Sequence, residues 1–129
     1  MALLRLKEIF MRLMSSYPGT KPGSYIAQVS YSDEEGFGAL WDSERRGVPL
    51  FAPRGFRYRP CEGDSLLMLS GDSADICAGV LCRPDGLAPG ETELCGPNGS
   101  SILMRRNGDI TLNGVTITKQ GQIIPKDGV

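Results

Sequence analysis

The sequence contains no histidine, and this absence removes several classes of function. Histidine is the usual acid–base catalyst near neutral pH, a common ligand of zinc and iron, and the partner that activates Ser and Cys nucleophiles. A single chain without histidine cannot build any of these sites. We therefore look for the function in features other than histidine chemistry.

The sequence also lacks a long hydrophobic run and a dominant charge. Residues 1–14 are largely apolar, but Arg5, Lys7, Glu8 and Arg12 interrupt them, so they contain no continuous signal-peptide core. No segment approaches the roughly 20 apolar residues of a membrane span. With 14 Lys and Arg against 15 Asp and Glu, the net charge is −1, which gives no general attraction to nucleic acid or anionic membrane. These patterns predict a soluble protein made in the cytoplasm.

The four cysteines, Cys61, Cys77, Cys82 and Cys95, form no CxxC pair, so a zinc or thioredoxin-like motif is poorly supported. Cys77 and Cys82 are five residues apart in a predicted strand, which places them on opposite faces. We predict small core or partly buried residues in a reducing compartment. The sequence alone leaves open whether any two of these cysteines form a disulfide.

Acidic residues form two groups, Asp33-Glu34-Glu35 and the pair Asp72 and Asp75. Paired carboxylates can hydrolyse glycosides, but both groups fall in predicted turns, where turn chemistry and solubility explain them. No catalytic residue, metal ligand or cofactor site emerges. We expect the chain not to be an enzyme.

Residues 2–14 predict a short helix, supported by the Glu8–Arg12 pair at i, i+4. Such a short helix is marginal alone and must pack against another surface. That surface is either the helix's own domain or a neighbouring subunit, and both alternatives remain open. The side chains available for the contact are Leu3, Leu6, Ile9, Phe10, Leu13 and Met14.

After the Pro/Gly-rich residues 17–23, the hydrophobic period changes to two. The 17 glycines and several turn sequences indicate many short strands. Five or six strands in about 65 residues predict a small closed antiparallel barrel of the OB type. The predicted strands cover residues 25–31, 36–41, 48–52, 56–58, 65–69 and 76–82.

Beyond a second linker at 84–90, very short strands at 101–106, 109–112, 115–119 and 122–125 alternate with glycine turns. Two of these turns are Asn-Gly dipeptides, the strongest local signal for a hairpin. Thr111, Thr116 and Thr118 fall on one face of the strands. The apolar face carries Ile102, Met104, Ile110, Leu112, Val115, Ile117 and Ile123.

A ribbon of this kind has nothing in its own chain to cover its apolar face, apart from packing on the barrel. Leaving each large aliphatic side chain in water forgoes roughly 1.5–3 kcal/mol. Three copies solve the problem if each forms one wall of a triangular prism with its apolar face on the axis. Strands spaced about 4.8 Å apart would then build a rod on the order of 20 Å long. We predict a homotrimer.

Residues 49–60 interleave aromatic and arginine side chains, including Phe56, Arg57, Tyr58 and Arg59. On an OB barrel this pattern is typical of a surface that binds single-stranded nucleic acid. The alternative is a strand–loop–strand with the aromatics on one face and the arginines outside. Overall neutrality and the nearby Asp33-Glu34-Glu35 favour the second interpretation, so we expect no specific nucleic-acid partner.

The segment SSILMRRNGDITLNGVTITKQGQII, which follows the predicted barrel and a Pro/Gly linker, resembles the baseplate spike proteins of Mu-like contractile-tailed phages. This family is called baseplate assembly protein V and is related to the spikes of pyocins and type VI secretion. The sequence EGDSLLMLSGDSADICAGVLC is similar to the family's closing barrel strands. The resemblance covers roughly residues 20–124.

The resemblance implies an all-β protein with an N-terminal helix and linker (1–20), an OB-like barrel (21–86) and a short intertwined trimeric β-helix (87–129). A homotrimer would sit on the tail axis in the virion baseplate or a phage-like particle and pierce the target cell envelope. A hub protein would contact Leu3, Leu6, Ile9, Phe10 and Leu13. Some relatives carry a His-x-His iron site at the tip; this chain has no histidine, so a sharpened tip would need a separate capping protein.

Overall fold

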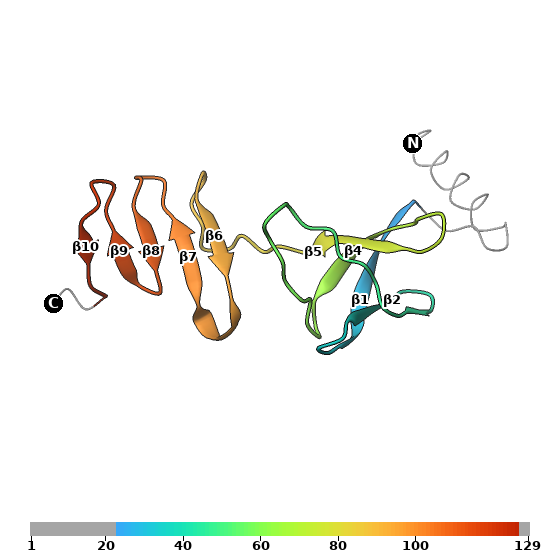
Figure 1. Ribbon diagram of the computed structural model, residues 1–129. Helices are drawn as coiled ribbons and strands as arrows, with labels where there is room; N and C mark the ends of the chain where they lie inside the picture. The colour runs from blue at the N-terminus through green and yellow to red at the C-terminus, as the bar shows by residue number, and fades with distance from the viewer. Residues whose placement is uncertain (1–22, 127–129) are drawn as a thin grey trace, which may run out of the picture. The chain divides into compact units, whose positions relative to one another are not determined.

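The computed structural model describes residues 23–126, so the helix predicted at 2–14 lies outside the described residues. Within them, strands form two antiparallel sheets of five strands each (Figure 1), and the helical structure is one short 3₁₀ turn. The prediction of an all-β fold is confirmed. The chain divides into two units, up to Cys82 and from Arg83 onward, and each is described by itself.

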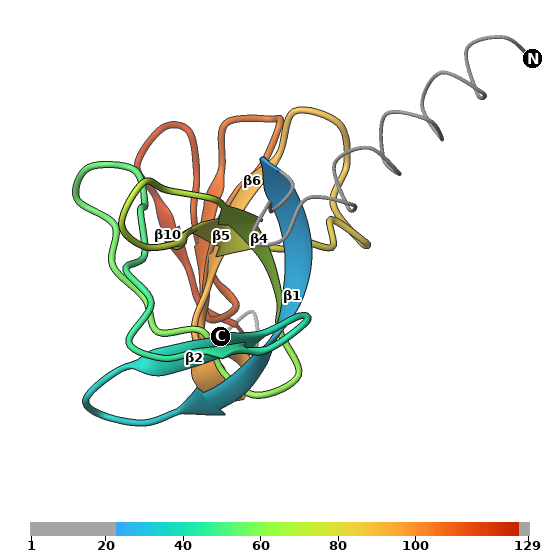
Figure 2. The same cartoon turned by 90° about the vertical axis from the view of Figure 1, so that its right-hand side faces the viewer.

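The first sheet has the strand order β3-β2-β1-β4-β5, with antiparallel neighbours throughout. β1 is the long central strand, and its curvature (Figure 2) coincides with a bulge between Val29 and Tyr31, because a bulge bends and twists the strand that carries it. The strands are β1 (Ser24–Ser32), β2 (Phe37–Leu40), β3 (Glu44–Arg45), β4 (Ser65–Leu69) and β5 (Ile76–Val80).

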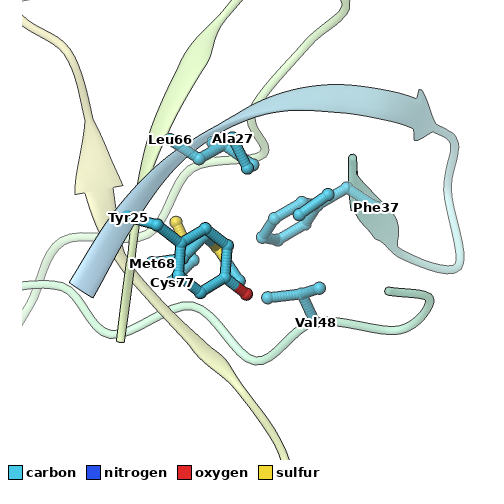
Figure 3. Packing of buried hydrophobic residues seen from close by; sticks show 8 residues of the cluster. Tyr25, Ala27, Phe37, Val48, Leu66, Met68 and Cys77 are labelled. Atoms are coloured by element: carbon cyan, nitrogen blue, oxygen red, sulfur yellow. The ribbon is translucent and has the colours of Figure 1, made fainter. Parts of the chain in front are cut away.

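The inner face of this sheet carries the hydrophobic core. In β1, Tyr25 and Ala27 are buried while Ile26 between them is exposed, as the period of two requires. The core side chains converge from four strands and from the segment after β3 (Figure 3). They are Tyr25, Ala27, Phe37, Ala39, Val48, Leu66, Met68 and Cys77.

The first sheet is not closed, because no ladder joins β3 to β5. The segment after β3 instead bonds to both β2 and β5: the Val48 amide donates to the Phe37 carbonyl (3.1 Å), and the Cys77 amide donates to the Pro49 carbonyl (2.9 Å). The Phe51 amide then donates to the Cys77 carbonyl at 2.9 Å. The strand predicted at 48–52 is therefore one parallel bridge, Leu50 to Cys77.

The strand predicted at 56–58 is wrong. These residues lie in an irregular loop that follows a turn in which the Phe56 amide donates to the Pro53 carbonyl (3.0 Å). Gly55 has a φ of 90° in this turn. Proline removes ladder donors, and Pro53 and Pro60 bracket the segment; aromatic content alone was a misleading strand signal.

A polar cluster links the two edges of the first sheet. Arg45 of β3 donates from Nε to Asp75 Oδ2 at 3.1 Å, and Asp75 stands just before β5. The Tyr25 hydroxyl also donates to Asp75, and the Tyr25 ring stacks on Trp41 with centroids 4.7 Å apart. Asp75 is only 5% exposed, so its assignment to turn chemistry and solubility was wrong.

The cysteines also differ in part from expectation. Cys77 is a core residue, whereas Cys61, Cys82 and Cys95 are exposed. Cys82 follows the end of β5 at Val80, so the argument that placed Cys77 and Cys82 on opposite faces of one strand does not apply. The three exposed thiols lie in turns or near strand ends, where the alternation of a sheet does not fix their burial.

The second sheet is a simple meander in the order β10-β9-β8-β7-β6 (Figure 1). A short 3₁₀ turn, η1 (Pro97–Gly99), joins its first two strands. β6 was missed because its sequence, TELC, lacks the β-branched alternation of the later strands. The strands are β6 (Thr92–Cys95), β7 (Ser101–Met104), β8 (Ile110–Leu112), β9 (Val115–Ile117) and β10 (Ile123–Ile124).

Both Asn-Gly dipeptides form hairpin turns, as predicted, but of different types. Asn113 and Gly114 have φ angles of 49° and 89° and form the two-residue turn between β8 and β9, because a type I′ turn needs positive φ at both positions. At the other dipeptide only Gly108 is left-handed, with φ 97°. There Arg105 and Asp109 close a three-residue loop through an amide–carbonyl bond of 2.9 Å.

Candidate assembly surface

The second sheet gathers its large aliphatic side chains on one face, which we call the apolar face. Residues directly opposite each other in neighbouring strands share a face, and the register places all seven predicted residues together. Leu94 of β6 stands opposite Ile102 and adds an eighth, which the missed strand had hidden. The register pairs are Ile102–Leu112, Met104–Ile110, Ile110–Ile117, Leu112–Val115 and Ile117–Ile123.

The apolar face is largely open in the single chain. Ile110 and Leu112 at its centre are each 37% exposed, and Ile123 at its end is 70% exposed. Val115 and Ile117 are partly buried. A monomeric protein rarely leaves so many adjacent aliphatic side chains in water unless they mark an interaction site.

The second unit has no hydrophobic core of its own among residues 83–126. Every buried hydrophobic residue belongs to the first unit, and the one buried residue described in the second unit is Thr111. The sheet therefore lacks the packed layer that normally stabilises a β-meander, because three or more strands need a covered hydrophobic face. Its apolar face is the surface that can supply this layer through assembly.

The opposite face is more polar, although not uniformly. Thr111 and Thr116 stand opposite each other in β8 and β9, and the Arg105 guanidinium donates from Nε to Thr111 Oγ1 at 3.3 Å. Leu103 and Ile124 also lie on this face. The sheet is thus amphipathic, with the aliphatic side chains concentrated on the apolar face.

At one end of the strands, carboxylate side chains accept hydrogen bonds from the backbone of neighbouring turns. Asp109 Oδ1 accepts the Lys119 amide at 3.0 Å, and Glu91 accepts the amides of Ala88 (3.0 Å) and Arg106 (3.4 Å). The Ala88 amide is the main reason that the pKa of Glu91 lies below its usual value. These bonds fix the stacking of successive rungs.

A similar connection exists at the opposite end of the strands. Asn113 Oδ1 accepts the Ser101 amide at 2.9 Å, and the Asn113 amide donates back to the Ser101 carbonyl at 3.2 Å. Lysine stems cover the turn glycines: Lys119 lies against Gly108, and Lys126 lies against Gly114. Both sides of the meander are therefore braced by contacts between turns.

A separate feature of the first unit is the arginine and aromatic loop at 52–59. It lines most of a cavity of about 540 Å³ together with Phe37, Val48 and Leu50. Phe56 is 51% exposed and Tyr58 45% exposed, and Arg59 donates to the Glu34 carbonyl at 3.3 Å. The interleaving of aromatics and arginines is real, but it lies on a loop.

Among residues 23–126, no cluster of Cys, Asp and Glu side chains is arranged to hold a metal ion. In the same range, no helix is long and apolar enough to cross a membrane. The predicted hub-contact residues Leu3, Leu6, Ile9, Phe10 and Leu13 lie outside the described residues.

No known family model matches the chain, and no curated protein is significantly similar to it.

Proposed function

We propose that this chain is a structural protein that assembles into a homotrimer through the apolar face and forms the central spike of a contractile tail baseplate. The observation that carries the proposal is the combination of an exposed aliphatic face with a unit that has no described hydrophobic core. Assembly would bury the apolar face between copies and so give this unit a hydrophobic core. This mechanical role requires neither a catalytic residue nor a cofactor.

Three copies suit this face because three sheets arranged around one axis would turn their apolar faces towards each other and cover them. The five strands would form rungs about 4.8 Å apart, giving a short intertwined prism on the order of 20 Å long. Ile102, Ile110 and Ile117 would lie near the axis. The threonine-bearing face would be turned to solvent, and the bonds between turns would stiffen the rod.

The first unit would be the OB-like barrel of this spike. Its five-stranded order, together with the parallel bridge from Leu50 to Cys77, is consistent with the partly open barrel of that fold. The Arg45–Asp75 contact would help to hold the two edges near each other. OB folds serve many functions, so this part supports the proposal without specifying it.

The assignment to a tail baseplate comes from the resemblance to the baseplate assembly protein V family. In that setting the trimer would dock on a hub protein in a phage or phage-like particle and pass through the target envelope during contraction. A separate capping protein would contact β10, the edge strand of the second sheet. Genome neighbours that encode sheath and tube proteins would indicate a phage, whereas neighbours that encode toxins would indicate a nonviral injection machine.

Immunogold electron microscopy tests this function. Antibodies against the chain should label the baseplate end of contractile tail particles made by the organism that encodes it, at one site per particle. Particles lacking the gene should show no label and should fail to penetrate cells. Intact, fully active particles that never contain the chain would refute the proposed role.

The loop at 52–59 supports a second candidate, a module for single-stranded nucleic acid. Neither Arg54 nor Arg57 forms an ion pair with any residue between 23 and 126, and both line the cavity beside Phe56. Fluorescence anisotropy with a labelled dT15 oligonucleotide tests this candidate. Tight binding that weakens with salt and is lost in Arg54→Gln/Arg57→Gln would favour it; weak binding that vanishes at moderate salt favours the spike.

A further inference from the structure

A second exposed apolar surface lies on the outer face of the first sheet. Ile26 of β1 stands directly opposite Leu67 of β4, and they are 59% and 43% exposed. Leu69 is the next outward residue of β4 and is 36% exposed, and Leu40 of β2 is 49% exposed. We call these four residues the outer patch.

The outer patch departs from the usual pattern of a sheet that has one face in water. Such a face is ordinarily polar, and this one is polar at one end, where Gln28 donates to Ser65 Oγ at 3.0 Å. Leu40 lies opposite Gln28 at this end, whereas Ile26, Leu67 and Leu69 lie towards the start of β1. Three of the four patch residues are therefore on the side where the chain enters the sheet, which indicates a partner that arrives from that side.

We propose that the outer patch is covered by the apolar segment 2–14 of the same chain. The point of entry supports this occupant: Ser24 pairs with Leu69, and the Gly23 carbonyl accepts the Ser70 amide at 3.1 Å. Gly23, to which the segment 1–22 is joined, therefore lies directly beside the patch. The amphipathic helix predicted at 2–14 would lay its aliphatic side chains across Ile26 and Leu67.

The connecting residues are long enough for this arrangement. The eight residues 15–22 can span at most about 26–29 Å when fully extended, so the segment can turn back over strands that lie side by side. The sequence Tyr-Pro-Gly-Thr-Lys-Pro-Gly at 17–23 would supply the turn, because Pro and Gly favour turns. Tethering also gives the segment an effective concentration in the millimolar range, an advantage over any untethered partner.

Docking would lower the free energy of both the segment 2–14 and the outer patch. A helix of about 13 residues is marginal in water, and the outer patch is too apolar to be left exposed without consequence. Docking covers both at once. This inference concerns the first unit alone and does not depend on the spike or on trimer formation.

Photocrosslinking in the full chain tests the inference. Leu67 is replaced by p-benzoylphenylalanine, the protein is irradiated, and the products are separated by mass and digested. A crosslink from position 67 to residues 2–14 within one chain is expected. A product of doubled mass would show that a second copy covers the patch, and no crosslink at all would show that the patch is open; either result overturns the proposal.

Limited trypsin digestion gives an independent readout, because Arg5, Lys7 and Arg12 are cleavage sites. Docked, these sites should be cut slowly, and Ile26→Ser/Leu67→Ser should raise the cleavage rate about tenfold or more, since cleavage follows the open population. Ile124→Ser, an exposed isoleucine of the second unit, is the matched control and should leave the rate unchanged. Equal rates in all three proteins would refute the docking.

Discussion

Replacing Ile110 by aspartate is the most informative perturbation of the apolar face. In the single chain Ile110 is 37% exposed, so complete burial on assembly recovers about 0.6–1.1 kcal/mol of the roughly 1.5–3 kcal/mol for full burial of such a side chain. The loss of this term in three copies costs the trimer about 2–3 kcal/mol. The larger effect comes from three carboxylates that meet near the axis, each costing several kcal/mol when buried without a partner.

Together these terms amount to at least about 10 kcal/mol per trimer, or roughly seven orders of magnitude in the association constant at 1.4 kcal/mol per tenfold. The concentration at which a trimer half-dissociates scales with the inverse square root of that constant. It should therefore rise by about three orders of magnitude. Sedimentation velocity over a dilution series measures this shift, and circular dichroism checks that the first unit keeps its strands.

The matched control is Ile124→Asp. Ile124 is also exposed, at 47%, but its register with Thr116 places it on the opposite face, so the same substitution should leave the association constant nearly unchanged. An Ile110→Asp protein that associates as strongly as the parent would refute the reasoning. Equal weakening by both substitutions would show that the apolar face has no special role.

Three further predictions concern particular residues. Burial, followed by the bond to Asp75, raises the pKa of Tyr25 from 10.0 to about 12; the protonated form is favoured by folding, so the unfolding free energy of the first unit should decline from pH 10 to about 12. Urea titrations at each pH measure this decline, and Tyr25→Phe should abolish it. Asp75→Ala removes the acceptor of Tyr25 and Arg45 and should cost about 2–4 kcal/mol in urea unfolding; a loss near zero would contradict the linking role. Gly114→Ala, at φ 89°, should destabilise the second unit by about 1 kcal/mol or more in thermal unfolding, whereas Gly36→Ala, which meets no atom within 4 Å, should have little effect.

The apolar face was predictable from the sequence because strict alternation and tight turns leave few registers. A one-residue slip would move Ile110 and Leu112 to the other face, and the Asn113-Gly114 turn sets the pairing of β8 with β9. Leu94 was missed because β6 is separated from the regular repeat by η1. Local pattern therefore predicts the strands that repeat and fails at the one that does not.

The first unit was less predictable because its key contacts join residues far apart in the chain. Asp75 is 50 residues from Tyr25 and 30 from Arg45, and nothing in the local sequence separates this buried carboxylate from an ordinary turn aspartate. The segment 48–52 looks like a strand in the sequence, but it makes one backbone hydrogen bond to β2 and two to β5, and Pro49 cannot donate. Tertiary context decided both outcomes.

The mass of the purified chain in solution tests the central claim most directly. Size-exclusion chromatography with multi-angle light scattering should give about 42 kDa, three times the 13.9 kDa of one chain. A species of 13.9 kDa that persists at high protein concentration and is stably folded would contradict the account. The apolar face would then have to be covered within a single chain.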